Sequence, residues 1–285
     1  MSSPASSPGT SSAISPGIRA VVFDVGETLI DESRLWLRWA KRLNLPPLTF
    51  LGVLGGCAAL GRSYADAFEI VQPGIDVDAQ EAQWAHDEPS SLRSGFDIGD
   101  LYPDVIPALT ALRRCGVRLI IAGNQPPAAK LALDAMNLPV DAIVNSAELG
   151  VEKPSDAFFD AVAQLAADVL GLKADAVGAD AGEAVGADAV GTADAHAHAH
   201  AQSAAPARPA GRLDRASIAY IGDRVDNDVL PALRQGMVPI LLRRGPWGYL
   251  HAADMSRFGL DAQTVTVVDS LLELPGALNL HSKHR

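Results

Sequence analysis

Short apolar runs recur along this chain and alternate with segments whose apolar residues are spaced as on one face of a helix. The apolar runs span residues 19–23, 117–122, 140–144, 217–221, 237–242 and 264–268. The helical segments span residues 102–115, 126–136, 155–170 and 226–235. Such alternation is typical of parallel strands, because each crossover returns the chain to the start of the next strand. The pattern predicts an α/β protein with a doubly wound, Rossmann-like parallel sheet.

The ends of the predicted helices carry suitable boundary residues. Pro103 stands near the start of the first helical segment, and Gly116 directly follows its end. This order matches the preference of proline for a first helical turn and of glycine for the position after a helix. Ser155 is suited to cap the third helix, and Gly236 ends the fourth.

Two stretches interrupt the alternation and divide the chain into domains. Residues 32–97 look mostly helical, hold Trp36, Trp39 and Trp84, and are too long for an ordinary connection after a strand, so we expect a helical cap. Residues 173–212 consist mainly of Ala, Gly, Asp and His without apolar periodicity, so we expect an unstructured low-complexity insert within the core. The other expected parts are a core of residues 18–31 and 98–275, a disordered tail of residues 1–17 and a C-terminal tail of residues 276–285.

Composition narrows the functions that fit. The 285 residues carry a formal net charge of −11, which disfavours nucleic-acid binding through bulk charge, and 48% of them are hydrophobic, which is enough for a core. Cys57 and Cys115 lie far apart without metal-ligand spacing, so we expect two buried free thiols. No apolar run reaches the ~18 residues of a membrane span, and residues 1–17 lack a secretory signal pattern. We therefore expect no membrane partner and, by default, a cytoplasmic location.

Four polar segments each come after a predicted strand. They are Asp24-Val25-Gly26-Glu27-Thr28, then Gly123-Asn124, then Glu152-Lys153-Pro154, and last Gly222-Asp223-Arg224-Val225-Asp226-Asn227-Asp228. Taken singly, Asp24 could be a turn residue, Lys153 an exposed lysine and Asp228 a helix cap. Because parallel strands end at one edge of the sheet, where α/β proteins bind ligands, we expect the four segments to converge.

This ordered set resembles the haloacid dehalogenase-like hydrolase superfamily, over roughly residues 19–275 without the insert. The resemblance implies a Rossmann-like core with a helical cap after the first motif. It also implies that Asp24 is the nucleophile, that Lys153 orients it and neutralises phosphate charge, and that Asn124 contacts the phosphate. The magnesium ligands that it implies are Asp24, the backbone carbonyl of Gly26, Asp223 and Asp228. These roles agree with the physics, because a carboxylate that attacks a phosphate dianion needs nearby positive charge.

Two positions depart from the family pattern. Gly26 stands where phosphatases of the family usually carry a second Asp that serves as general acid and base. The adjacent Glu27 is our candidate to replace it at the substrate. Gly123 stands where the family usually has Ser or Thr, and its backbone N–H could contact the phosphate instead. A weakened general acid would favour acyl or aryl phosphates, whose leaving groups need no proton.

The function that we expect is hydrolysis of a small phosphorylated metabolite with Mg²⁺, through an aspartyl-phosphate on Asp24. One alternative is a catalytically impaired binding or regulatory protein, which Gly26 and Gly123 would support. Another is a phosphonate-type hydrolase of carbon–phosphorus bonds, with Lys41 as the Schiff-base lysine. The pair of Asp223 and Asp228 argues against a metal-free dehalogenase. Whether the protein forms a homodimer stays open.

Several other side chains have both a functional and a structural interpretation. The cap rings Trp36, Trp39, Tyr64, Phe68 and Trp84 are expected mainly to form a core. Arg34 and Arg38 could meet an anionic substrate, while Arg243 and Arg244 could bind substrate or only end a strand. His196, His198 and His200 could bind a metal if extended, although a solvated linker is the simpler interpretation.

Overall fold

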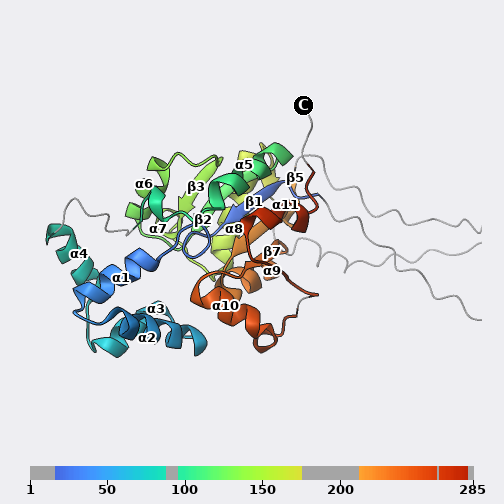
Figure 1. Cartoon of the computed structure of the whole chain (residues 1–285). Helices are drawn as coiled ribbons and strands as arrows, with labels where there is room; N and C mark the ends of the chain where they lie inside the picture. The colour runs from blue at the N-terminus through green and yellow to red at the C-terminus, as the bar shows by residue number, and fades with distance from the viewer. Residues whose placement is uncertain (1–16, 88–95, 175–211, 262, 282–285) are drawn as a thin grey trace, which may run out of the picture.

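The computed structural model describes residues 17–87, 96–174, 212–261 and 263–281. A six-stranded parallel sheet with the order β3-β2-β1-β6-β7-β8 forms its centre (Figure 1). The strands are β1 Ala20–Phe23, β2 Arg118–Gly123, β3 Ala142–Asn145, β6 Ile218–Gly222, β7 Val238–Leu242 and β8 Thr266–Val268. Each strand overlaps one predicted apolar run, so the prediction of an α/β protein with a parallel sheet is confirmed.

Helices cover both faces of this sheet. They are α5 Val105–Cys115, α6 Pro127–Ala135, α8 Asp156–Val169, α9 Leu230–Arg234 and α11 Leu274–Ala277. Val21 and Phe23 pack in the cluster that includes residues of α5, α6 and α11. Ala20 and Val22 pack in the opposite cluster, which includes residues of α8 and α9. Because successive side chains of a strand point to opposite faces, a sheet covered on both sides needs uninterrupted apolar runs.

The register of the strands brings the polar segments to one edge. Phe23, the last residue of β1, is paired with Ile121 of β2 and with Ile221 of β6. The residues that follow these three lie next to one another at the carboxyl ends of adjacent strands. The strand order runs outward from β1 through β2 and then, on the other side, through β6. This reversal is the position at which open α/β sheets bind ligands.

Four helices form the cap between β1 and β2: α1 Ser33–Arg42, α2 Pro47–Ala59, α3 Tyr64–Val71 and α4 Val77–Asp87. They lie to one side of the sheet in Figure 1. Their core is aromatic, with the ring of Trp39 4.8 Å from that of Phe68 and 5.3 Å from that of Trp84. Trp36 packs against this cluster and is only partly buried. The expected helical cap is confirmed, and its rings are mainly core.

The cap packs against the core domain through helix α2. Trp247 of α10 (Gly245–Ala253) is buried against Leu54, Cys57 and Ala58 of α2. Cys57 and Cys115 are both buried free thiols, as the sequence predicts. None of the helices in the described part of the chain has the length and apolarity needed to cross a membrane.

Short structured elements lie at the two ends of the predicted insert and at the start of the predicted C-terminal tail. The insert begins and ends in two short parallel strands, β4 Lys173–Ala174 and β5 Arg212–Leu213, while the residues between them lie outside the described ones. The core continues past residue 275, because α11 ends at Ala277 and Leu278 is buried. The expected N-terminal tail falls outside the described residues, apart from Gly17.

The remaining elements are short. They are α7 Ser146–Leu149, the π-helical turn η3 Val225–Val229 and the 3₁₀ turns η1 Ile98–Asp100, η2 Arg215–Ser217, η4 Met255–Phe258 and η5 Leu271–Glu273. The helix predicted over residues 226–235 therefore consists of two parts, η3 followed by α9. The wider turn of η3 carries Asp226 and Asp228, two of the acidic residues of the fourth polar segment.

Candidate active site

Asp24 is the first residue after β1, and hydrogen bonds fix its backbone at the edge of the sheet. Its N–H donates to the carbonyl oxygen of Ile221 in β6 at 2.9 Å. The chain then turns sharply, because the N–H groups of Leu29 and Ile30 both donate to the carbonyl oxygen of Val25, at 2.8 and 3.0 Å. Asp24 is only 8% exposed. The turn therefore places a buried carboxylate at the carboxyl edge of the sheet.

Asp223 and Asp228 reach the same edge from β6 and η3. The N–H of Arg224 donates to Oδ2 of Asp228 at 3.0 Å, which holds this side chain over the end of β6. Only glycine fits beneath it, since a Cβ on Gly222 would lie 2.3 Å from Cγ of Asp228. His251 of α10 supports the turn by accepting a hydrogen bond from the N–H of Val225 at its Nδ1, at 2.9 Å.

Lys153 lies between two of these carboxylates. Its Nζ is 2.6 Å from Oδ1 of Asp24 and 2.6 Å from Oδ1 of Asp228. Burial alone would lower the pKa of Lys153, but the charges of Asp228 and Asp24 outweigh that effect and hold the pKa well above its usual value. Lys153 is therefore a buried ammonium group that links the first and the last polar segments.

Asn124 positions the loop that carries Lys153. Its amide donates to the carbonyl oxygen of Lys153 at 2.9 Å and accepts from the N–H of Lys153 at 2.8 Å. This paired contact uses one of the two N–H donors of the amide and leaves the other one for a ligand. The role of Asn124 as a phosphate contact stays a prediction, and its role in holding Lys153 is a feature that the sequence did not reveal.

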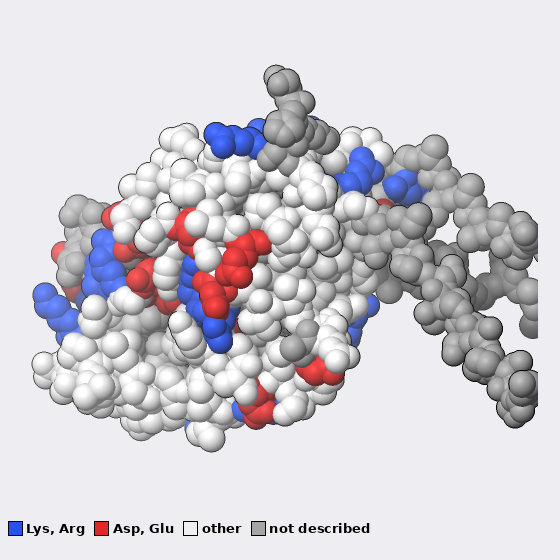
Figure 2. All heavy atoms as spheres, turned by 45° about the vertical axis from the view of Figure 1, so that its right-hand side comes forward, with Lys and Arg blue, Asp and Glu red and all other residues white. Residues whose placement is uncertain are grey.

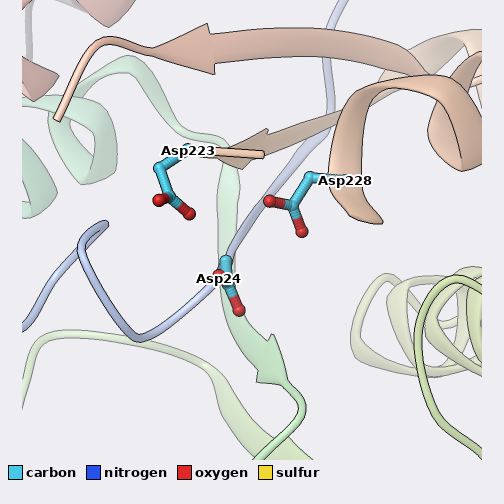
Figure 3. A group of neighbouring side chains, drawn as sticks. All are labelled: Asp24, Asp223 and Asp228. Carbon is cyan, nitrogen blue, oxygen red and sulfur yellow. The ribbon is translucent and has the colours of Figure 1, made fainter. Parts of the chain in front are cut away.

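The three carboxylates of Asp24, Asp223 and Asp228 converge on one point. Figure 3 shows the three side chains close together, and one oxygen of each lies within 4.8 Å of the others. Burial, together with repulsion by Asp228 and Asp24, raises the pKa of Asp223 well above its usual value. Burial and repulsion by Asp24 also raise the pKa of Asp228, against the opposing effect of Lys153.

The residues of this cluster fit a small divalent cation. Three carboxylates supply hard oxygen ligands, which is the donor set that Mg²⁺ prefers. Lys153 offsets part of their charge, while burial and the repulsion among the carboxylates raise the pKa values of Asp223 and Asp228. A divalent cation placed among the three oxygens would relieve this repulsion.

Gly123 allows Asp24 to lie against the end of β2. A Cβ on Gly123 would lie 2.6 Å from Oδ1 of Asp24 and 3.2 Å from Cγ2 of Val25. The absence of a side chain at this position therefore makes room for the carboxylate of Asp24. The predicted contact between the backbone of Gly123 and a phosphate is compatible with this close approach and stays a prediction.

Glu27 lies within the turn after Asp24 and has a positive φ of 51°. Its carboxylate accepts hydrogen bonds from the hydroxyl of Tyr102 at 2.5 Å and from the N–H of Glu32 at 3.1 Å. Burial raises the pKa of Glu27, although these two hydrogen bonds oppose the shift. Both oxygens are thus occupied, so the geometry gives Glu27 a positioning role, and its predicted contact with substrate stays a prediction.

Glu32 is the acidic side chain of this site that the sequence patterns did not identify. Its carboxyl group lies against Gly26, where a Cβ would be 2.5 Å from Oε1 of Glu32. Burial, repulsion by Glu27 and repulsion by Asp24 raise the pKa of Glu32 to about 8. No motif marks this residue, and its only signal in the sequence is an acidic pair, Asp31-Glu32, directly before the cap.

A cavity of about 930 Å³ lies between the cap and the core domain. Its cap side is formed by aromatic and acidic residues, and its core side by the loops after β2 and β3. Glu32 and Asn124 line it and also contact the loops that hold the acidic cluster. The residues that line it include Glu32, Trp36, Trp39, Tyr64, Phe68 and Asn124.

The arginines proposed as substrate contacts are engaged elsewhere. Arg34 forms ion pairs with Asp97 and Asp100, and the guanidinium of Arg38 lies 4.6 Å from the ring centre of Trp84. Arg243 pairs with Asp269 at 2.6 Å. In Figure 2, acidic and basic side chains likewise lie next to one another in the middle of the face shown.

Arg244 connects the turn after Asp24 to the core instead of facing the cavity. It donates to the carbonyl oxygen of Thr28 at 2.9 Å and to the carboxylate of Asp104 at 2.6 Å. Lys41 is exposed in the last turn of α1 and does not line the cavity. The histidines of the insert lie outside the described residues.

Comparisons with known proteins agree with this geometry. The family model described as haloacid dehalogenase-like hydrolase matches residues 18–236. A glyceraldehyde 3-phosphate phosphatase from Methanopyrus kandleri is 26% identical over 246 residues, which cover 81% of this chain and 86% of that protein.

Solved structures share the fold. A magnesium-bound HAD hydrolase from Bacillus subtilis has a TM-score of 0.55 at 15% identity, over 93% of this chain and 100% of its own. A haloacid dehalogenase-like hydrolase from Bacteroides fragilis has a TM-score of 0.55 at 17% identity, over 90% of this chain and 99% of its own. The family model spans most of the chain, and the matched residues include Asp24, Lys153 and Asp223. This protein therefore belongs to the haloacid dehalogenase-like hydrolases.

Proposed function

We propose that this protein is a magnesium-dependent phosphatase that hydrolyses a small phosphorylated metabolite through an aspartyl-phosphate on Asp24. The observation that carries the proposal is the buried arrangement in which Lys153 bridges Asp24 and Asp228 at 2.6 Å each. An acidic cluster of this kind is costly to bury, so a chain that only needed a stable fold would gain from apolar residues there.

The chain's own residues account for the first chemical step. Lys153 binds Oδ1 of Asp24 and so orients the carboxylate, whose other oxygen can attack phosphorus. The ammonium group of Lys153 also offsets charge on the incoming phosphate. Magnesium, held by Asp24, Asp223, Asp228 and the carbonyl of Gly26, would supply further positive charge next to the phosphate oxygens.

The cavity and the similar phosphatase suggest which substrates to try first. A space of about 930 Å³ accommodates a small metabolite and falls within the usual size of ligand pockets, roughly 300–1,000 Å³. The relative from Methanopyrus kandleri is a glyceraldehyde 3-phosphate phosphatase, and it matches 81% of this chain. Phosphorylated three-carbon compounds are therefore our first candidates.

The experiment is an assay of phosphate release by the full-length chain. Glyceraldehyde 3-phosphate, p-nitrophenyl phosphate and acetyl phosphate would be tested with Mg²⁺ and after chelation. We expect turnover that requires the metal and is abolished in Asp24→Asn, which keeps the shape of the side chain. Glu69→Gln, which alters an exposed carboxylate on α3, serves as the matched control.

A non-catalytic binding protein is the second candidate, and Gly26 is the observation that favours it. A non-catalytic protein of this kind would bind Mg²⁺ without turnover of any substrate, so the same assay separates the two functions. The phosphonate alternative loses its support, because Lys41 is exposed and lies outside the set of residues that line the cavity.

A further inference from the structure

The space in which residue 26 would carry a side chain is filled by the carboxyl group of another residue. A Cβ on Gly26 would lie 2.5 Å from Oε1 and 2.8 Å from Cδ of Glu32. Both distances are far shorter than a van der Waals contact, so the carboxyl group of Glu32 occupies the volume that such a side chain would need. A carboxyl group therefore stands beside the nucleophile turn although the sequence has glycine there.

The backbone of Glu32 is held in this place from both sides. Its N–H donates to Oε1 of Glu27 at 3.1 Å, and its carbonyl oxygen accepts from the N–H of Trp36 at 3.0 Å. Glu32 is the N-cap residue of α1, yet its side chain makes no capping hydrogen bond. The carboxyl group is thus not used to begin the helix, and it borders both Gly26 and the cavity.

The carboxyl groups around Asp24 differ in their partners, and that of Glu32 accepts a hydrogen bond from the side chain of Trp36. Asp228 accepts from Lys153 and from the N–H of Arg224. Glu27 accepts from Tyr102 and from the N–H of Glu32. Asp223 belongs to the proposed metal ligands. Glu32 therefore combines two properties that a proton donor needs, a place beside the nucleophile turn and a side chain that lines the cavity.

We propose that Glu32 is the residue that transfers protons in this phosphatase, from the position that a side chain at residue 26 would take. The inference rests on the proposed function. In the first step, the bond between Asp24 and phosphorus forms, the bond from phosphorus to the leaving oxygen breaks, and the proton of Glu32 goes to that oxygen. In the second step, Glu32 takes a proton from water as the water oxygen bonds to phosphorus, the bond from phosphorus to Asp24 breaks, and inorganic phosphate leaves. Both side chains then return to their initial state.

The first test compares leaving groups in a single turnover. The leaving group of glyceraldehyde 3-phosphate is an alkoxide, which needs a proton. The leaving group of p-nitrophenyl phosphate is p-nitrophenolate, which leaves without one. We expect Glu32→Gln to slow release of the alcohol by ~10²–10⁴-fold and release of p-nitrophenolate by less than about 10-fold. Glu69→Gln, an exposed carboxylate on the same cap, is expected to change neither rate.

The second test moves the carboxyl group back to residue 26. Gly26→Asp alone places a side chain against Glu32 and is expected to be inactive or unstable. Glu32→Ala opens the space, so the double variant Gly26→Asp/Glu32→Ala is expected to recover alkyl-phosphate turnover at least 10-fold above Glu32→Ala. Melting temperatures of all four chains show whether a loss of activity is a loss of folding.

The outcomes separate this inference from the proposed function. Equal slowing of both leaving groups in Glu32→Gln, or no slowing of either, overturns the role of Glu32 while the phosphatase stands. Failure of the folded double variant to exceed Glu32→Ala also overturns it. A wild-type chain that releases no phosphate from any substrate overturns the proposed function, and this inference with it.

Discussion

The acidic cluster at the sheet edge and the start of the cap contribute to the candidate site in different ways. Asp24 and Asp223 follow directly after paired strands, so the register of the sheet fixes where they meet. Glu32 reaches the same place from the first residue of a helical cap, through a contact with Gly26. The comparison teaches that the charge of the site is built into the sheet, whereas the proposed proton donor depends on how the cap is joined to it.

The largest expected effect comes from removing the ammonium group of Lys153, which pairs with Asp24 and Asp228. Lys153→Met leaves Asp24 and Asp228 buried without their partner, so we expect loss of phosphatase activity and destabilisation by about 3–5 kcal/mol. Urea unfolding of the metal-free chain measures the change. Lys130→Met, which removes an i,i+4 pair with Asp134 on α6, should cost about 0.3–0.5 kcal/mol.

If Lys153→Met lowered the free energy of unfolding as little as Lys130→Met does, the buried charges at the sheet edge would not depend on Lys153. The same measurement with saturating Mg²⁺ sharpens the comparison. If the metal and Lys153 neutralise the same carboxylates, Mg²⁺ should stabilise Lys153→Met more than the wild-type chain.

A smaller effect is expected where a strand end is crowded by a carboxylate. Gly222→Ala places a Cβ 2.3 Å from Cγ of Asp228, so Asp228 must move and the chain should lose about 1–3 kcal/mol. Gly52→Ala in α2 is the matched control, because nothing lies within 4 Å of its added Cβ. This helical glycine should gain about 0.5–1 kcal/mol when it is replaced.

Thermal or urea unfolding of both glycine variants would show whether the position matters. A Gly222→Ala chain as stable as Gly52→Ala would mean that Asp228 is free to relocate. It would also mean that the sheet edge is less rigid than the packing at Gly222 implies.

A further expected effect is a pH dependence that originates at the start of the cap. The pKa of Glu32 is raised from 4.5 to about 8 by burial and by repulsion from Glu27, Asp24 and Asp31. Between these values the folded chain binds more protons than the unfolded one, so the free energy of unfolding falls as pH rises from about 4.5 to about 8. Glu32→Gln should flatten this slope in the metal-free chain.

Some slope should remain in Glu32→Gln, because the pKa values of Glu27, Asp223 and Asp228 are raised as well. Stability curves in urea at several pH values measure the difference, with Glu69→Gln as the control. A slope that is identical in wild type and Glu32→Gln would show that this carboxyl group is more hydrated than its contacts with Gly26 and the cap suggest.

The sequence was most informative where strands dictate position. Asp24, Lys153, Asp223 and Asp228 could be predicted to converge, because apolar runs reveal parallel strands and parallel strands end at one edge. The packing of Asp24 against Gly123 needed the structure, since no periodicity reports how closely two loops approach. Glu32 could not be predicted either, because its place depends on the angle at which α1 leaves the nucleophile turn.

The cap shows the same limit. Its aromatic residues were expected to form a core, since rings at helical spacing usually pack together. That Arg34 joins the cap to η1 and that Arg38 stacks on Trp84 depends on tertiary contacts, which the spacing of two arginines does not specify. Long flexible side chains are therefore the ones for which the sequence left open alternatives.

The short parallel pair β4 and β5 places the two ends of the insert side by side. A loop anchored in this way can change length at little energetic cost, roughly 0.6 kcal/mol for each doubling. The position between β4 and β5 is consequently a suitable insertion site for protein engineering. A fluorescent domain or an affinity handle placed between Ala174 and Arg212 should report on the enzyme without touching the sheet edge or the cap.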